Sequence, residues 1–343
     1  MKKITIRDVA KAAKVSYVTV SNVINDTGRM SEKTKAKVKQ VIKKMNFYPD
    51  LSARTLASGK SDAIAFVSSY LSSPFVISVL SGVERRLFET NKFKHSLAHY
   101  STRGAKEIKE TTLRNILYGK KADAVILLTI KPDQGMMREF RDRGIPVILI
   151  ENKAQGAHTV RIDNYKGAYE AVDYLIKKGK RKIALINGPE GPSAYDEEAN
   201  PVVKDRESGY LDALRDNGIV FDPKKVFSVV YFNEEEGMRL TRVIKEAAMD
   251  IDAIFCAAGD MVSLGIIMQS RKSGIKIPED IALIGFDDIN VASVMTPALT
   301  TVRQPLDEMG KASFDLAIQS LENRNFKPQN IILQPKLIIR ESA

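Results

Sequence analysis

The sequence predicts two folds in one chain: an N-terminal all-α helix-turn-helix domain with a hinge helix, joined to a two-lobed α/β core with parallel sheets. Two observations predict this division. Residues 1–60 contain only helical patterns and carry 14 Lys and Arg residues against 4 Asp and Glu residues. From Ala63 onwards, short apolar runs rich in β-branched residues alternate with helical stretches. Such alternation is typical of parallel sheets covered by helices on both faces.

The N-terminal segment begins with two short helical patterns that meet at a tight turn. Thr5 is placed to cap a helix over residues 6–13, the turn is Lys14 and Val15, and Ser16 caps a second helix over residues 17–25. Ser31 then caps a third helix over residues 32–45. The apolar side chains expected to form the core of this domain are Val9, Ala13, Val15, Val20, Val23, Ile24, Val38, Val41, Ile42 and Met45. A half-buried, half-polar second helix is how this motif presents a reader to the major groove.

The net charge of the chain is concentrated in this N-terminal segment. The chain carries +11, of which residues 1–60 carry +10, because residues 61–343 hold 39 basic and 38 acidic side chains. This asymmetry indicates a polyanionic partner for the N-terminal segment alone. The alternative is a solvated basic face without a partner.

Residues 50–57, DLSARTLA, connect the basic domain to the core. They are long enough for two helical turns, which are marginal in water on their own. A helix here would need DNA or a second copy of itself to stay folded.

The core pattern predicts strands and helices in regular alternation. The expected strands cover residues 63–67, 95–98, 124–128, 146–150, 183–186, 226–230, 253–256 and 281–285. The expected helices include residues 77–89, 106–117, 165–178, 208–217, 234–249, 261–272 and 306–321. This stretch of chain is too long for one such sheet, so two lobes are expected, with a break near residues 152–160. Ligands of such folds bind beyond the carboxyl ends of the strands, which predicts a cleft between the lobes.

Several classes of protein are disfavoured by composition. No apolar run approaches the roughly 20 residues of a membrane span, and charged side chains interrupt the N-terminus where a signal peptide would be apolar. Cys256 is the only cysteine, so a reducing cytoplasm is the expected location. The three histidines, His95, His99 and His158, have no cysteine partners at zinc spacing. We therefore expect no metal and no cofactor.

Four stretches carry a resemblance to a known family: TIRDVAKAAKVSYVTVSNVIN at the start, LSARTLA, IALINGP, and IALIGFDDINVASVMTPALTTVRQP. In this order the chain resembles the lactose-repressor (LacI/GalR) family of bacterial transcription regulators over its whole length. The resemblance implies a DNA-binding domain at residues 1–49, a hinge helix and linker at 50–60, and an effector-binding and dimerisation core at 61–343. That core resembles periplasmic binding proteins, with lobes of roughly 61–160 plus 304–331, and 161–303 plus 332–343.

The resemblance also assigns the DNA contacts. Tyr17, Val18 and Asn22 occupy the base-reading positions. Valine has only apolar atoms to offer, such as to a thymine methyl, whereas the asparagine amide matches an adenine edge. Position 22 is often arginine in the family, so we expect an adenine where relatives prefer guanine; a phosphate contact by Asn22 is the alternative. The phosphate-contacting positions are Thr5, Ser16, Thr19, Ser21 and Asn25, and the minor-groove hinge positions are Ala53 and Leu56.

Leu56 matches the family residue that wedges between base pairs, which bends a duplex toward its major groove. Ordinary packing of a linker helix is the alternative for Leu56. Lys14 departs from the glycine that is frequent at the turn. If its backbone is left-handed, a lysine there costs on the order of 1–2 kcal/mol.

The effector-binding positions implied by the resemblance are Ser73, Phe75, Glu151, Arg206, Phe232, Asp287 and Gln304. Carboxylates and arginine bind hydroxyls while aromatic rings cover an apolar ring face, which suits a sugar or sugar derivative. A structural ion pair is the alternative for Arg206 and Asp287, and plain core packing for the two phenylalanines. Two departures bear on the ligand: Gly259 stands where the family usually carries asparagine, and the segment 188–206 is several residues longer than usual.

The expected protein is thus a regulator, most simply a repressor and not an enzyme, that acts as a homodimer on a pseudo-palindromic double-stranded operator in the bacterial cytoplasm. No heptad extension follows the core, and the helices at 77–89 and 261–272 are the expected dimer interface by analogy. Whether the effector releases or tightens DNA binding stays open, as does control by a non-sugar corepressor or a protein partner. A transport-type binding protein is opposed by the basic N-terminus.

Overall fold

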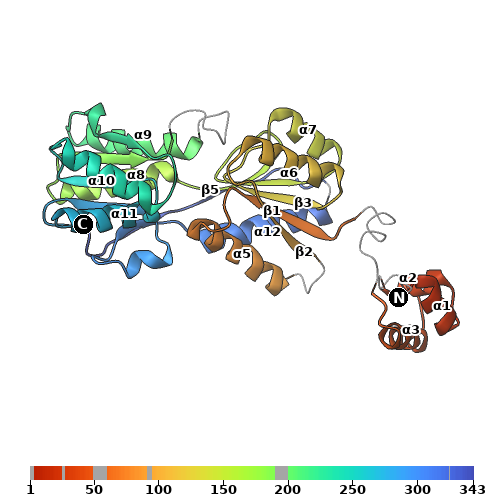
Figure 1. The fold of residues 1–343 in the computed structure, drawn as a ribbon. Coiled ribbons are helices and arrows are strands. Elements are labelled where there is room, and N and C mark those ends of the chain that lie inside the picture. Colours follow the sequence, from red (N-terminus) through yellow and green to blue (C-terminus); the bar gives the residue numbers. More distant parts are fainter. Residues whose placement is uncertain (1–3, 25–27, 49–59, 91–94, 190–199, 324) are drawn as a thin grey trace. The chain divides into compact units, whose positions relative to one another are not determined.

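The computed structural model describes residues 4–24, 28–48, 60–90, 95–189, 200–323 and 325–343. It divides the chain into two compact units, Met1–Ser61 and Asp62–Ala343, drawn from red through yellow and green to blue along the chain in Figure 1. The described residues include no helix that is both long and apolar enough to cross a bilayer.

The N-terminal unit is a three-helix domain whose helices begin at side-chain caps. Its helices are α1 (Ile6–Ala13), α2 (Tyr17–Ile24) and α3 (Glu32–Lys44). Thr5 and Asp8 form a capping box, in which the Thr5 backbone N–H donates to Asp8 Oδ2 at 2.8 Å. Ser16 Oγ accepts from the Thr19 N–H at 3.1 Å, which caps α2 as predicted. The Ser31 side chain caps α3 in the same way.

The core of this unit is formed by the apolar stripe of each helix. Buried and half-buried side chains pack together as expected from helical spacing, and the structure adds Ile6, Ala10, Met30 and Phe47 to the predicted set. The cluster consists of Val9, Ala10, Ala13, Val20, Val23, Val38 and Phe47, with Ile6, Val15, Ile24, Met30, Val41, Ile42 and Met45 packed against it. The predicted helix-turn-helix fold is confirmed.

The second unit contains two α/β lobes, each built around one six-stranded sheet. The first sheet has the order β11-β5-β4-β3-β1-β2, and all of its pairings are parallel. Its strands are β1 (Ala63–Ser68), β2 (Ser96–Ser101), β3 (Ala124–Leu128), β4 (Val147–Ile150), β5 (His158–Ile162) and β11 (Asn330–Leu333).

The faces of the first sheet are covered by helices, because alternate strand residues feed two separate cores. Ile64 and Phe66 of β1 belong to one apolar cluster, and Ala65 and Val67 to the other. The first cluster includes α5 (Pro74–Thr90) and α12 (Leu306–Glu322), and the second includes α6 (Lys106–Tyr118) and α7 (Gln134–Asp142). Strands buried on both faces explain the continuous apolar runs in the sequence.

The second sheet has the order β12-β10-β9-β8-β6-β7, with only β12 antiparallel. Its strands are β6 (Ile183–Asn187), β7 (Val226–Ser228), β8 (Ala253–Cys256), β9 (Ala282–Asp287), β10 (Thr300–Arg303) and β12 (Lys336–Ile338). Its helices are α8 (Asn164–Lys177), α9 (Pro201–Asp216), α10 (Glu234–Glu246) and α11 (Asp260–Ser273), with short 3-10 turns at Pro223–Lys225 and Asn290–Ser293.

Three features of the core differ from the sequence-based expectation. Strand β5 lies inside the predicted break, because its apolar residues pair with β4, so the chain leaves the first sheet only after Ile162. Strand β11 likewise holds residues up to Leu333 in the first lobe. The helix predicted at 208–217 begins at Pro201, because Asn200 caps it and proline fits its first turn. Strands β10 and β12 were also not predicted, whereas the α/β fold of the two lobes is as predicted.

Candidate functional site

The exposed face of α2 presents two large side chains to solvent. Tyr17 is 59% exposed and Val18 is 48% exposed, whereas Val20 and Val23 on the opposite face are buried. An exposed valine on a short helix contributes little to the core. The face is therefore available for contact with a partner.

Asn22 lies half-buried one turn further along α2, beside Gly28. A Cβ atom added to Gly28 would lie 3.2 Å from Asn22 Nδ2, and Gly28 has a φ of 81°. Gly28 thus lies close to the Asn22 amide because glycine leaves room there. A larger residue at position 28 would displace that amide.

The turn between α1 and α2 has a left-handed backbone at Lys14, the case considered in the sequence analysis. Lys14 has φ 53° and ψ 47°, a conformation that costs a non-glycine residue stability. The two helices therefore meet at a strained residue.

The expected phosphate-contacting residues are placed at helix starts or on α2. Thr5 and Ser16 are exposed, and Ser16 Oγ lies 2.9 Å from Thr19 Oγ1. Ser21 is half-buried on α2. Asn25, Ala53 and Leu56 lie outside the described residues.

In the core, Glu151 lies directly after β4 and is buried. Its Oε1 accepts from the Ile162 N–H at 2.7 Å, and its Oε2 accepts from Asn164 Nδ2 at 2.6 Å. Burial raises the pKa of Glu151, while the bond from Asn164 and the charge of Arg206 oppose that rise. The Glu151 carboxylate therefore ties the end of β4 to the point where the chain enters the second lobe.

Arg206 is buried on α9 and continues this network. Its Nε donates to Asn164 Oδ1 at 2.8 Å, and its Nη1 donates to the Ala257 carbonyl at 2.6 Å. The guanidinium carbon lies 3.6 Å from the centre of the Phe286 ring. Burial lowers the pKa of Arg206, and the charges of Asp287 and Glu151 counteract that effect.

Asp287 ends β9, and Gln304 follows β10 where the chain returns to the first lobe. Gln304 Nε2 donates to Asp287 Oδ1 at 2.6 Å, while the buried Gln304 Oε1 has no hydrogen-bond partner among the described residues. Burial raises the pKa of Asp287 to about 6, although Arg206 and Gln304 lower it. Gln304 Oε1 can therefore still accept a hydrogen bond, whereas both carboxylate oxygens of Glu151 already accept one.

Gly259 lies beside Asp287, and the backbone explains why it is not an asparagine. Its φ is 101°, and a Cβ added there would lie 2.9 Å from Asp287 Oδ2. A side chain at this position would be strained and would crowd the carboxylate. The departure from the family pattern therefore leaves Asp287 Oδ2 open on that side.

The remaining expected effector residues are less enclosed. Ser73 lies half-buried immediately before α5, and Phe75 packs its ring against the core in the first turn of that helix. Phe232 is 57% exposed after β7, and its ring lies against Gly188, where a Cβ would be 3.2 Å from it. The structure brings Arg206 together with Glu151 through Asn164, and Asp287 together with Gln304.

Sequence reasoning missed three partners of this network. Asn164 bridges Glu151 and Arg206, Phe286 lies under the guanidinium, and the buried Asp260 accepts from the Ile289 N–H and the Thr301 hydroxyl. Burial raises the pKa of Asp260 well above its usual value, as does the charge of Asp287. Phe286 directly follows the predicted strand 281–285, which was the signal available in the sequence, whereas Asn164 follows β5, a strand that the sequence did not predict.

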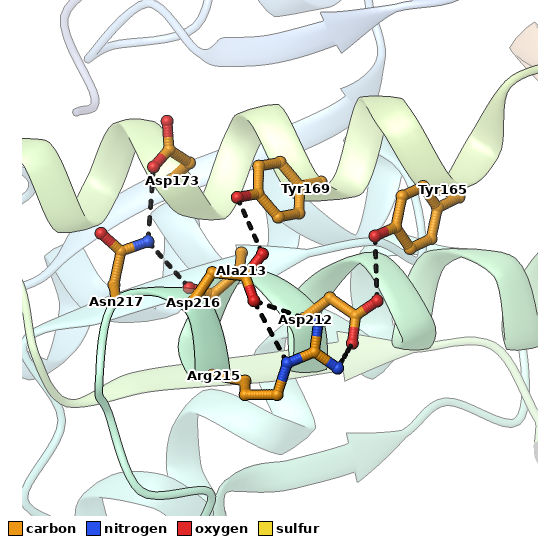
Figure 2. A network of polar contacts seen from close by, with 8 residues as sticks. All are labelled: Tyr165, Tyr169, Asp173, Asp212, Ala213, Arg215, Asp216 and Asn217. Atoms are coloured by element: carbon orange, nitrogen blue, oxygen red, sulfur yellow. Dashed lines mark hydrogen bonds and ion pairs between the residues drawn. The ribbon is translucent and has the colours of Figure 1, made fainter.

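Helices α8 and α9 carry Asn164 and Arg206, and an exposed ladder of polar contacts joins them (Figure 2). The Tyr165 hydroxyl donates to Asp212 Oδ2 at 2.9 Å, and the Tyr169 hydroxyl donates to Asp216 Oδ2 at 3.2 Å. Beneath the ladder, a Cβ on Gly209 would lie 2.3 Å from the Tyr165 carbonyl oxygen. The helices are in backbone contact, which fixes Arg206 relative to Asn164.

Comparison with known proteins identifies this arrangement. The family model "Bacterial regulatory proteins, lacI family" matches residues 5–50, and that of a periplasmic binding protein-like domain matches residues 172–343. The HTH-type transcriptional regulator DegA of Bacillus subtilis (strain 168) is 34% identical, with 99% of this chain and 98% of DegA covered.

Two solved structures cover nearly all of the chain. A lac repressor dimer bound to operator and the anti-inducer ONPF superposes with a TM-score of 0.83 at 25% identity, covering 99% of both chains. A complex of the transcriptional regulator CelR with cellobiose gives a TM-score of 0.72 at 28% identity, covering 99% of this chain and 100% of CelR. The three-helix unit with its exposed α2 face, and the two lobes joined through Asn164 and Gln304, are thus those of a DNA-binding transcriptional regulator with an effector-binding core. The chain belongs to the lacI family of bacterial regulatory proteins.

Proposed function

We propose that this regulator is a repressor that binds a pseudo-palindromic operator as a homodimer and is switched by a sugar or sugar derivative held between its lobes. The observation that carries the proposal is the polar network at the strand ends. Glu151, Asn164 and Arg206 lie at one crossing between the lobes, and Asp287 and Gln304 at another. A ligand that binds there and prefers one closure state shifts the whole core toward that state.

Operator recognition rests on Tyr17, Val18 and Asn22. The exposure of Tyr17 and Val18, with the half-buried Asn22 one turn further along α2, supports contacts to base edges, with Val18 on a thymine methyl and Asn22 on adenine. Thr5, Ser16, Thr19, Ser21 and Asn25 fix the register on phosphates. Residues 50–60 supply the hinge helix, in which Leu56 wedges into the minor groove beside Ala53.

Selection of duplexes from random DNA by the full chain tests this recognition. We expect an inverted repeat in which one position of each half-site is adenine. Substitution Asn22→Arg should change that position to guanine. A guanine selected by the wild-type chain would contradict the assignment of Asn22.

The ligand is proposed from the residues at the strand ends together with the cellobiose that CelR holds. Asp287 Oδ2 supplies an open acceptor for hydroxyls, Arg206 supplies donors, and the exposed Phe232 ring supplies a stacking surface. Ser73 and Phe75 close the site from the first lobe. Glu151 acts by holding Asn164 and Arg206 in place.

Thermal unfolding of the full chain in the presence of candidate ligands tests this site, starting with cellobiose, monosaccharides, nucleosides and amino acids. A ligand should raise the melting temperature in a concentration-dependent way, and the shift should be lost in Asp287→Asn. A nucleoside or amino acid that gives the shift in place of sugars would overturn the sugar assignment and retain the regulator. The sign of its effect on operator binding then separates an inducer from a corepressor.

The dimer interface is proposed on α5 and α11. The outer face of α5 leaves Ile77 48% and Phe88 76% exposed, and Met268 is exposed on α11. Apolar side chains of this size are typical of the centre of an interface. Sedimentation of Phe88→Glu should show monomers where the wild-type chain forms dimers.

A further inference from the structure

The turn that follows β9 begins with two strained residues, and the first of them carries the Asp287 carboxylate. Asp287 has a φ of 112° and Asp288 has a φ of 56°. Both values lie in the left-handed region, which residues other than glycine rarely adopt. Strained residues persist only where the surrounding structure holds them, and they cluster at functional sites. This turn therefore depends on contacts that keep its shape.

The Asp288 carboxylate is held by two arginines from different parts of the chain. Its side chain is only 5% exposed. Its Oδ2 accepts from Arg303 Nε at 2.5 Å, and its Oδ1 accepts from Arg340 Nη2 at 2.7 Å. Arg303 ends β10, and Arg340 follows β12. Because the second sheet runs β12-β10-β9, these bonds tie the end of β9 to the two strands beside it.

Arg340 is itself fixed by the backbone at the start of β10. Its Nη1 donates to the Leu299 carbonyl at 2.7 Å, and its own N–H donates to Thr300 Oγ1 at 2.9 Å. A planar guanidinium can bridge a carbonyl and a carboxylate in one geometry, which the single ammonium of lysine does not reproduce. Arg340 therefore holds Asp288 from a fixed position.

The residues on either side of Asp288 are bonded as well. The Gln304 N–H donates to the Asp287 carbonyl at 3.2 Å, and the Ile289 N–H donates to Asp260 Oδ2 at 3.0 Å. The Asp287 side chain belongs to the strained residue itself, so its direction depends on the backbone of the turn. Releasing Asp288 would let that backbone relax and would turn the Asp287 carboxylate out of its place.

We propose that Asp288, Arg303 and Arg340 form a clasp that positions the Asp287 carboxylate for its ligand. Arg303 is 52% exposed, so the larger part of this role falls to Arg340. Arg340 acts through Asp288 and Asp287 and is therefore a positioning residue. The inference rests on the proposed function in taking Asp287 as a ligand-binding residue.

The test uses the full chain and reads the environment of Asp287 without a ligand. The charged and polar groups that face Asp287 are Arg206 of α9, Glu151 of β4, Asp260 of α11 and Gln304 of β10. Burial raises the pKa of Asp287 to about 6. The free energy of unfolding of each protein is compared with that of its Asp287→Asn counterpart at pH 4.5 and pH 7.5. In the wild-type chain this gap should change with pH.

Two variants break the clasp from opposite sides. Arg340→Met removes a positive charge and Asp288→Ala removes a negative one, so charge alone would move the pKa of Asp287 in opposite directions. Loss of the clasp moves it toward its ordinary value in both. The pH-dependent change in the gap should therefore fall by more than half in both variants. Arg340→Lys keeps the charge and should give an intermediate change.

Ser342→Ala is a matched control in the same segment after β12. The Ser342 hydroxyl donates to the Leu283 carbonyl at 2.6 Å and accepts from the Thr300 N–H at 2.8 Å, and the residue is fully buried. This variant should lose stability, because two buried backbone groups lose their partner. It should keep the pH-dependent change in the gap, since neither bond involves the Asp288 carboxylate.

A pH-dependent change that stays at the wild-type size in Arg340→Met and Asp288→Ala would overturn the clasp. So would pKa shifts of opposite sign in these two variants, an equal reduction in Ser342→Ala, or a wild-type gap that does not change with pH.

Thermal shift by cellobiose separates this inference from the proposed function. If cellobiose shifts the wild-type chain, the concentration needed for half of the shift should rise at least tenfold in Arg340→Met and stay unchanged in Ser342→Ala. An unchanged concentration in Arg340→Met would contradict the positioning role. A wild-type chain that responds to no sugar contradicts the sugar assignment alone, and the pH measurement still decides whether the clasp exists.

Discussion

The α2 face and the polar network between the lobes differ in burial. Tyr17 and Val18 are exposed, so they contribute little to the packing of their unit. Arg206 and Glu151 are buried, and their polar atoms are bonded to Asn164 and to backbone groups of neighbouring strands. A substitution on α2 should therefore alter recognition at little cost in stability, whereas one in the network should alter both.

The largest expected effect is that of Arg206→Ala. Removing the guanidinium takes a donor from Asn164 Oδ1 and another from the Ala257 carbonyl, and it leaves the buried Asp287 and Glu151 carboxylates without their nearby cation. Removing the cation that compensates buried carboxylates costs about 3–5 kcal/mol. Chemical denaturation followed by circular dichroism measures the loss in the core transition.

The matched surface substitution is Val18→Ala, which should change the free energy of unfolding by less than about 0.5 kcal/mol while it weakens operator binding. Comparable losses of stability in the two variants would contradict the contrast between the regions.

A second expected effect concerns pH. Burial holds the pKa of Asp287 at about 6, above its ordinary value of 3.8. The folded chain thus binds a proton more tightly than the unfolded chain, so this group favours folding at low pH and that contribution is lost as pH rises from about 4 to about 6. Relative to Asp287→Asn, the wild-type chain should lose up to about 3 kcal/mol over this range.

Unfolding of both proteins at pH 4.5 and pH 7.5 measures the difference, in which the titration of groups that do not interact with Asp287 cancels. A stability gap between wild type and variant that is the same at both pH values would show that Asp287 ionises normally.

The α1 cap offers a smaller effect in the N-terminal unit. Thr5→Ala removes the side chain that accepts from the Asp8 N–H and breaks the capping box. Such caps contribute about 1 kcal/mol, so the first unfolding transition should move to lower temperature. Thr5→Ser retains the hydroxyl and serves as the control, and it should melt within a degree or two of the wild-type chain.

The smallest expected effect has the opposite sign. Lys14→Gly relieves the left-handed backbone at the turn and should stabilise this unit by about 0.5–1 kcal/mol, after the greater flexibility of glycine in the unfolded chain is taken into account. Thermal unfolding of the full chain, monitored in the lower transition, checks the shift. A decrease in stability would mean that the lysine side chain makes a contact that outweighs the strain.

Sequence patterns predicted the N-terminal unit almost completely, because its information is local. Caps at Thr5, Ser16 and Ser31, and apolar residues at helical spacing, specify three helices and the faces they bury. The strand-helix alternation of the core was predictable for the same reason. Short edge strands such as β11 and β12 were missed, since their residues are half-exposed and carry no continuous apolar run.

The site in the core was predictable only in part. Family positions supplied Glu151, Arg206 and Asp287, but no local pattern indicates that Asn164 joins the first two. That contact depends on how β4, α8 and α9 are placed in three dimensions. The sequence also could not explain why glycine occupies position 259, because the explanation depends on its backbone angle φ and on its distance to the Asp287 carboxylate on a different strand.

One paired measurement tests the central claim, which is that sequence reading and ligand sensing reside in separable regions of a lacI-family regulator. Wild type, Asn22→Arg and Arg206→Lys are each subjected to selection from random DNA and to ligand-induced thermal shift. Asn22→Arg should change the selected base and keep the shift. Arg206→Lys should keep the selected sequence and lose the shift, because one ammonium group lacks the planar pair of donors. An Asn22→Arg chain that selects the wild-type sequence, or an Arg206→Lys chain with an undiminished shift, would contradict the account.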